Sequence, residues 1–248
     1  MKDYREKELK YLMIILILLF VVLCTPIKEL NITDIELHKS LTTVFSSIVV
    51  SSILSLATFI CDCLLSTNLK DKMVGLIFIP KAGETIFTRI NNGSVKDDRF
   101  SNSEAKIKYK EIISNIPKDK KERYKYENSN WYGIYKRYQE KGQVSQSQKD
   151  YLTCRDLFVE TILFLVLYFL SLVFYSEFVV FSFKYLLVII LIAIVTNIST
   201  HVKMNRFVNT VIALDVAEKN QTNGDRKNES NYKILSARKC RNVFIRIK

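Results

Sequence analysis

Residues 157–198 decide the fold of this chain, because they read LFVETILFLVLYFLSLVFYSEFVVFSFKYLLVIILIAIVTNI. The stretch holds two apolar runs, Leu157–Tyr175 and Val179–Ile198, with only a short turn between them. A helix needs ~20 apolar residues to cross the ~30 Å hydrocarbon core of a bilayer, and each run is close to that length. We therefore expect a transmembrane hairpin over residues 157–200.

Two further apolar runs near the N-terminus, Tyr11–Ile27 and Val44–Leu65, predict another hairpin over residues 1–65. A signal peptide is the alternative for the first run. Acidic residues precede that run and no small-x-small cleavage site follows it, so we expect a retained helix. The predicted fold class is a membrane all-α protein with four transmembrane helices in two hairpins.

Basic residues predict the orientation of these helices. The chain has 248 residues, 37 Lys and Arg, and a formal net charge of +12. Four crossings put 34 of the 37 basic residues on one side, which the positive-inside rule makes the cytoplasm. We expect both termini and residues 66–156 to be cytoplasmic and the membrane to be the inner membrane of a bacterium. The same charge would attract the anionic headgroups of the lipid bilayer.

The central segment, residues 66–156, carries signals of a folded domain. Lys72–Ile79 and Thr85–Ile90 resemble two strands joined by a turn. Ser101 and Glu104 form a capping box that opens a helix ending before Pro117. A charged connection follows at 118–123. Further helices are predicted over about 128–141 and from about 145 directly into the membrane.

The C-terminal tail, residues 201–248, is expected to complete this domain. The helix predicted over 205–218 places near one face the residues Val208, Val211, Ile212 and Leu214, and a polar linker follows at 220–230. Residues 242–247 alternate as a strand does, and a terminal strand is stable only when it is paired. The predicted hairpin offers an edge, so we expect one small cytoplasmic α+β domain built from the central segment and the tail.

The residue types that perform catalysis are not arranged for it. The six glycines form no phosphate-binding loop, no nucleophile elbow occurs, and the two histidines are far apart. The five cysteines show no metal-binding spacing, so we expect free thiols. The sequence therefore predicts no enzyme, no metal site and no cofactor.

A hydroxyl stripe runs along the second predicted helix. Its members, spaced so that they stack on one helical face, are Thr43, Ser47, Ser51, Ser55 and, near that face, Asp62. Small residues allow close packing of helices in a membrane, and this interpretation is favoured. The alternative is a water-filled pore in an oligomer with Asp62 at its mouth.

Buried acids in a membrane need partners. For Asp62 and Glu160 the nearest candidates along the sequence are Arg155 and Lys203.

Aromatic and basic residues meet in the helix predicted over 128–141. Trp131, Tyr135 and Tyr138 recur at helical spacing, with Lys136 and Arg137 beside them. This surface could stack a base and neutralise a phosphate. Packing of the aromatic rings against the predicted hairpin of strands is the favoured interpretation.

The layout of two helix pairs around a basic domain resembles the small four-helix membrane proteins of bacterial antiphage systems. These include the membrane subunit of Kiwa and the membrane effectors of cyclic-oligonucleotide signalling. The stretches that carry the resemblance are 128–132, 150–152 and Arg155-Asp156. It implies a homo-oligomer that senses infection or damages the membrane.

These observations lead to a functional hypothesis. The chain is expected to be an oligomeric membrane sensor or effector whose cytoplasmic domain binds a protein partner or a nucleotide ligand and alters the helix bundle. The alternative is a membrane-anchored scaffold that recruits a cytosolic partner without conducting ions. Direct nucleic-acid binding is a third hypothesis, and it is not favoured.

Overall fold

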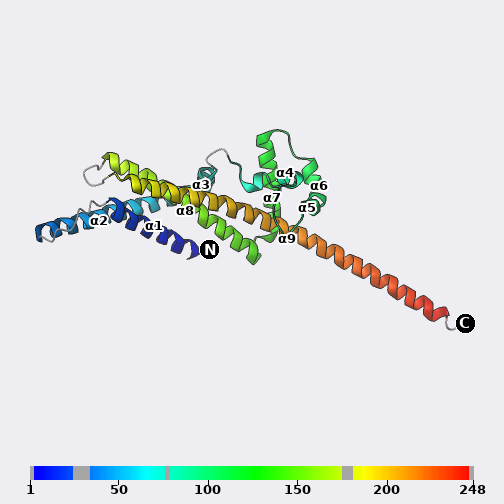
Figure 1. Cartoon of the computed structure of the whole chain (residues 1–248). Helices are drawn as coiled ribbons and strands as arrows, with labels where there is room; N and C mark the ends of the chain where they lie inside the picture. Colours follow the sequence, from blue (N-terminus) through cyan, green and yellow to red (C-terminus); the bar gives the residue numbers. More distant parts are fainter. Residues whose placement is uncertain (1–2, 25–33, 76–78, 175–180, 246–248) are drawn as a thin grey trace. The chain divides into compact units, whose positions relative to one another are not determined.

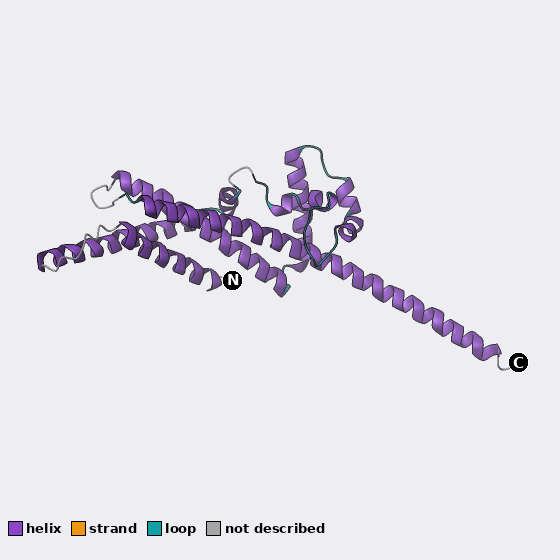
Figure 2. Cartoon of the chain, in the orientation of Figure 1, coloured by secondary structure: helices purple, strands orange, loops and turns teal. Residues whose placement is uncertain are grey.

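The computed structural model describes residues 3–24, 34–75, 79–174 and 181–245, and every regular element in these ranges is helical (Figures 1 and 2). The elements are α1 (Asp3–Cys24), α2 (Asp34–Leu64), α3 (Thr67–Val74), the short 3₁₀ helix η1 (Ala82–Glu84), α4 (Ile86–Asn91), α5 (Asn102–Lys108), α6 (Lys110–Ser114), α7 (Lys120–Tyr138), α8 (Gly142–Phe174) and α9 (Phe183–Ile245).

Among the described residues, three helical segments are long and apolar enough to cross a membrane. They are Val44–Leu64 in α2, Gly142–Val173 in α8 and Phe183–Glu218 in α9. The apolar part of α1, Leu9–Val22, is shorter. At 1.5 Å per residue it spans only ~21 Å of a ~30 Å hydrocarbon core, so a fourth span does not follow from its length. The architecture is that of a membrane all-α protein with several passes.

The chain divides into two compact units. Unit 1 comprises Met1–Lys81 and Gln146–Asn205, and unit 2 comprises Ala82–Ser145 and Arg206–Lys248. Two helices contribute to both units: α8 has its first residues in unit 2, and α9 leaves unit 1 after Asn205. Unit 2 therefore joins part of the central segment to part of the C-terminal tail.

The core of unit 1 is formed by apolar side chains from all four of its long helices. It contains Leu12, Leu16, Phe20, Leu54, Phe164, Tyr168, Tyr185 and Ile189. The rings of Tyr168 and Tyr185 meet edge to face with centroids 5.2 Å apart, and Phe20 packs against both. The Tyr185 hydroxyl donates a hydrogen bond to the Leu16 carbonyl at 3.1 Å, which satisfies this polar group inside an apolar core.

The opposite faces of these helices expose large apolar side chains. On α2 they are Phe45, Ile53, Leu56, Phe59 and Leu64, all more than half exposed. A soluble protein rarely exposes so large an apolar surface, whereas lipid solvates it without cost. The buried and exposed faces of α2 thus agree with its assignment as a membrane span.

Unit 2 packs α4–α7 against the part of α9 that begins at Arg206. Its core contains Ile86, Phe87, Ile90, Tyr109, Trp131, Ile134, Val208, Val211 and Ile212. Trp131 meets Phe207 edge to face, with ring centroids 5.4 Å apart. The predicted helical face is confirmed for Val208, Val211 and Ile212, which are at most 2% exposed, whereas Leu214 is only partly buried.

The predicted strands are wrong in the described residues. Residues 86–90 form α4, in which Ile86, Phe87 and Ile90 are fully buried at helical spacing. Lys72–Val74 is the last turn of α3, and 76–78 lie outside the described residues. Residues 242–245 continue α9, and 246–248 again lie outside. The described chain contains no strand, so the α+β domain is replaced by a helical unit.

Several helix boundaries also differ from the prediction. The capping box of Ser101 and Glu104 is confirmed, but the helix it opens is divided into α5 and α6 at Tyr109. α7 begins at Lys120, where Asp119 accepts hydrogen bonds from two backbone N–H groups, so it includes most of the predicted charged connection. Residues 220–230, predicted to be a linker, belong to α9.

Candidate functional site

The hydroxyl stripe of α2 lies on the buried face of this helix. Ser47, Ser51 and Ser55 are at most 9% exposed, and Asp62 is 2% exposed. The Ser51 hydroxyl donates to the Ile48 carbonyl at 3.0 Å within the same helix. The Thr43 side chain lies outside the described residues. Burial of small side chains inside a single chain supports the packing interpretation of the stripe over the pore.

Asp62 belongs to a buried ionic cluster in unit 1. Lys70 of α3 lies between two carboxylates, with its Nζ 2.6 Å from Asp62 of α2 and 3.7 Å from Asp156 of α8. All three side chains are at most 6% exposed. Buried charges are tolerated only when they are paired, and here one ammonium group joins three helices.

The cluster extends through Arg155 to Asp71, which follows Lys70 in α3. The Arg155 guanidinium lies 3.0 Å from Asp156 and 3.0 Å from Asp71. Asp71 also accepts hydrogen bonds from the Tyr151 hydroxyl at 3.1 Å and from Lys81 at 2.7 Å. Three carboxylates and two cations of α2, α3 and α8, together with Lys81 in the loop after α3, thus form alternating pairs that bind the short helix α3 to the bundle.

The predicted partners of the buried acids need correction. Asp62 pairs with Lys70, which the prediction did not name, and Lys203 pairs with Asp150 at 2.8 Å. Lys70 was missed because it lies beyond the end of α2, on a helix that folds back. The available signal was Ser66, whose side chain caps α3 by accepting a hydrogen bond from the Leu69 N–H. Glu160, on α8, is fully buried as well.

The aromatic surface predicted on α7 is divided by the structure. Trp131 and Tyr138 are buried, and the Trp131 ring stacks on Tyr135 at 5.6 Å. Lys136 and Arg137 are exposed. The buried rings belong to the core of unit 2, so these five residues do not form one open base-stacking platform.

Asp215 of α9 is a buried carboxylate of unit 2 with partners on several helices. It is 1% exposed and lies 2.7 Å from Lys108 Nζ and 3.2 Å from Arg137 Nη2. Its oxygens accept hydrogen bonds from the hydroxyls of Tyr109 at 2.6 Å and Tyr138 at 3.0 Å. A single side chain of α9 therefore holds the end of α5, the residue between α5 and α6, and the end of α7.

The two tyrosines that hydrogen-bond Asp215 both have raised hydroxyl pKa values. Burial raises the pKa of Tyr109 above its ordinary value of 10.0, and the negative charge of Asp215 raises it further. Burial and the hydrogen bond to Glu218 raise the pKa of Tyr138 as well. Both groups therefore stay protonated and act as hydrogen-bond donors.

Glu127 of α7 is a second buried carboxylate of unit 2. It is fully buried, and its Oε2 accepts hydrogen bonds from the backbone N–H groups of Phe87 at 2.8 Å and Thr88 at 3.0 Å. Its other oxygen accepts from the Thr88 hydroxyl. These groups open α4, whose own N-cap residue Thr85 makes no side-chain cap. Glu127 thus caps α4 from another helix.

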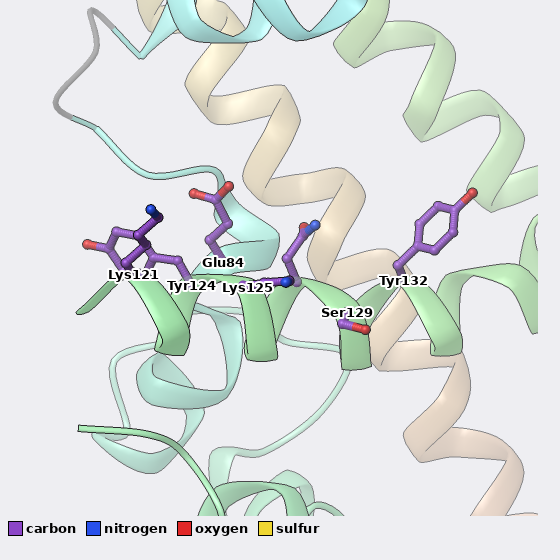
Figure 3. Close-up of a pocket in the computed structure, with 7 residues that line it drawn as sticks. Glu84, Lys121, Tyr124, Lys125, Ser129 and Tyr132 are labelled. Atoms are coloured by element: carbon purple, nitrogen blue, oxygen red, sulfur yellow. The ribbon is translucent and has the colours of Figure 1, made fainter. Parts of the chain in front are cut away.

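A pocket of about 540 Å³ lies over the outer face of α7 (Figure 3). It is lined by Glu84, Lys121, Tyr124, Lys125, Asn128, Ser129 and Tyr132. Glu84 comes from η1, which lies close to α7 because Gly83 has no side chain: a Cβ there would lie 3.0 Å from the Trp131 ring and 3.1 Å from Asn128 Oδ1. The ligand surface predicted from the sequence lies at residues 131–138 of the same helix and does not include Lys121, Lys125 or Tyr124.

Comparisons with family models, with curated proteins and with solved structures find no match, so the functional argument rests on the residues themselves. Within the described part of the chain no group of three or more His, Cys, Asp or Glu side chains could hold a metal ion. Cys61, Cys63 and Cys154 are free thiols.

Proposed function

We propose that this chain is a homo-oligomeric inner-membrane sensor or effector, in which unit 2 binds a ligand or protein partner and thereby alters the helix bundle of unit 1. The observation that carries the proposal is Asp215. It lies on α9, the helix that contributes to both units, and it is bonded to the other helices of unit 2. A ligand that moves those helices would therefore change the ion pairs and hydrogen bonds of this carboxylate.

α9 has residues in both units and therefore connects them covalently. Its apolar part in unit 1 packs through Tyr185 and Ile189, and its later part in unit 2 carries Phe207 and Asp215. Because α9 is helical throughout, a rotation or shift imposed in unit 2 changes the packing of the apolar part. The buried ionic cluster around Lys70 supplies alternative pairings among which the bundle could change.

The proposal includes a topology and a biological setting. Four spans, with α1 as the shortest, would place both termini and residues 66–156 in the cytoplasm, as the distribution of basic residues favours. The antiphage role rests on the resemblance in layout. Single cysteines introduced in 28–40, in a background without native cysteines, should react with an impermeant reagent in intact cells. Reaction of cysteines placed in 95–150 under the same conditions would contradict this topology.

Electrophysiology tests the functional proposal. The purified full chain is reconstituted in planar bilayers, its oligomer size is measured, and currents are compared for wild type, Asp215→Asn and the exposed control Asp98→Asn. A sensor that alters the bundle predicts an oligomer whose current changes in Asp215→Asn and not in Asp98→Asn. A silent bilayer for all three proteins, with a cytosolic protein retained by wild type, would support the scaffold instead.

A further inference from the structure

The pocket over α7 combines three kinds of group on one face. Lys121, Lys125, Asn128 and Tyr132 follow one another at the spacing of a single helical face, and Glu84 stands beside them (Figure 3). Both lysines and Tyr132 are exposed, so their polar groups are open to a ligand. Cations, aromatic rings and hydrogen-bonding groups thus converge over a volume within the range of small-molecule sites.

The charge at this pocket favours an anion. Lys121 and Lys125 line the pocket against the single lining acid Glu84. Lys120 and Arg123 add two positive charges in the first two turns of α7, against Glu122. Two of these cations also lie over the Tyr124 ring, with Lys120 Nζ 5.8 Å and Arg123 Cζ 5.7 Å from its centroid. Ammonium and guanidinium groups form their strongest hydrogen bonds with phosphate and carboxylate oxygens.

The rings favour a ligand with a flat aromatic group. Tyr132 is 48% exposed, and Lys136 Nζ lies 5.0 Å from its ring centroid, which holds the ring at the rim. Aromatic side chains at an open surface stack on planar heterocycles. Asn128 and Ser129 offer donors and acceptors, and Glu84 offers an acceptor for an amino or hydroxyl group.

We infer that this pocket binds a small phosphorylated aromatic compound of the nucleoside phosphate class. Lys121 and Lys125 hold the phosphate, Tyr132 contacts the ring, and Glu84, Asn128 and Ser129 hydrogen-bond the remainder. The inference deepens the proposed function, because it names the ligand class of unit 2. It differs from the predicted surface in that Trp131 and Tyr138 are buried in the core of unit 2 and do not line the pocket.

Binding of adenosine monophosphate to the full chain in nanodiscs tests the inference, with adenosine and inorganic phosphate as partial probes. We expect saturable binding of the complete probe and at least about tenfold weaker binding of each part, because the ring and the phosphate contribute separately. Lys121→Ala and Lys125→Ala should each weaken binding about tenfold. Tyr132→Phe should preserve binding, and Tyr132→Ala should weaken it.

The matched control is Lys110→Ala, which removes an exposed positive charge from α6 outside the pocket. An equal loss of affinity in Lys110→Ala and Lys121→Ala would overturn the assignment, because it would mean that overall charge decides binding. Tight binding of single-stranded DNA without saturable binding of the monophosphate would also overturn it, in favour of nucleic acid. The bilayer measurement compares wild type with Asp215→Asn and uses no monophosphate. Failure of the monophosphate to bind would therefore contradict the ligand class and leave the test of the functional proposal unchanged.

Discussion

Asp215→Asn is the substitution with the largest expected effect on unit 2. The change keeps the size of the side chain but removes a negative charge that faces Lys108 and Arg137. Removing one member of a buried ion pair costs about 3–5 kcal/mol, because the remaining charges are left uncompensated. Lys108 is 17% exposed and Arg137 62% exposed, so water compensates part of the loss. We expect about 3 kcal/mol, near the lower end of that range.

The structure also indicates how much of this loss in the free energy of unfolding comes from a single hydrogen bond of Asp215. Tyr138→Phe removes a hydroxyl that donates to Asp215 and leaves both ion pairs, so it should cost about 1 kcal/mol. The control Asp98→Asn changes an exposed carboxylate and should cost less than about 0.5 kcal/mol. The expected order of destabilisation is Asp215→Asn, then Tyr138→Phe, then Asp98→Asn.

Hydrogen exchange of the full chain in nanodiscs measures this order locally. A loss of 3 kcal/mol raises the opening equilibrium by about two orders of magnitude, since each 1.4 kcal/mol is tenfold. Peptides containing Tyr109 and Tyr138 should therefore exchange about a hundredfold faster in Asp215→Asn, while peptides from the core of unit 1 should not change. Acceleration of less than threefold at both tyrosines would refute the role of Asp215.

Three further predictions follow from the buried groups. Glu127→Ala leaves the N–H groups of Phe87 and Thr88 without their acceptor, so their exchange should accelerate by at least about tenfold, whereas the exposed control Glu140→Ala should have no effect. Because Ser51 is fully buried, Ser51→Ala should be tolerated in thermal unfolding, whereas Ser51→Leu should lower the melting temperature and disturb the oligomer. An intact Ser51→Leu oligomer that has lost ion flux would instead support a pore. Burial raises the pKa of Tyr109 above 10.0, so its contribution to the stability of unit 2 is fully present below pH 10 and is lost as the pH rises further. Tyr109→Phe should reduce that loss in alkaline unfolding followed by tyrosinate absorbance.

The helical spans were predictable because lipid imposes a simple requirement on sequence. Every backbone polar group in a membrane must be satisfied within its own segment, so a long apolar run becomes a helix whatever surrounds it. The runs beginning at Val44, Leu157 and Val179 met that condition. The capping box at Ser101 was predictable for a related reason, since its bonds join residues only three apart.

The strands were predicted wrongly where local pattern and tertiary contact disagreed. Thr85–Ile90 alternates, but Ile86 and Ile90 also lie one helical turn apart, and the short segment satisfies both periods. Glu127, about forty residues further along the chain, decides between them by capping the first N–H groups of α4. A contact at that separation leaves no trace in the local sequence.

By itself, the sequence determined that this chain enters a membrane, that its charge is concentrated in the segments between and after the apolar runs, and that small hydroxyl side chains share one face of α2. These properties follow from composition and helical period, which act over a few turns. Only the tertiary structure decided that Lys70 joins Asp62 to Asp156, that Asp215 holds the end of α7, and that Lys121 and Glu84 line one pocket. The physical reason is that charges and hydrogen bonds are specific in three dimensions. Their partners come from different helices, and packing of the apolar faces sets the distances between them.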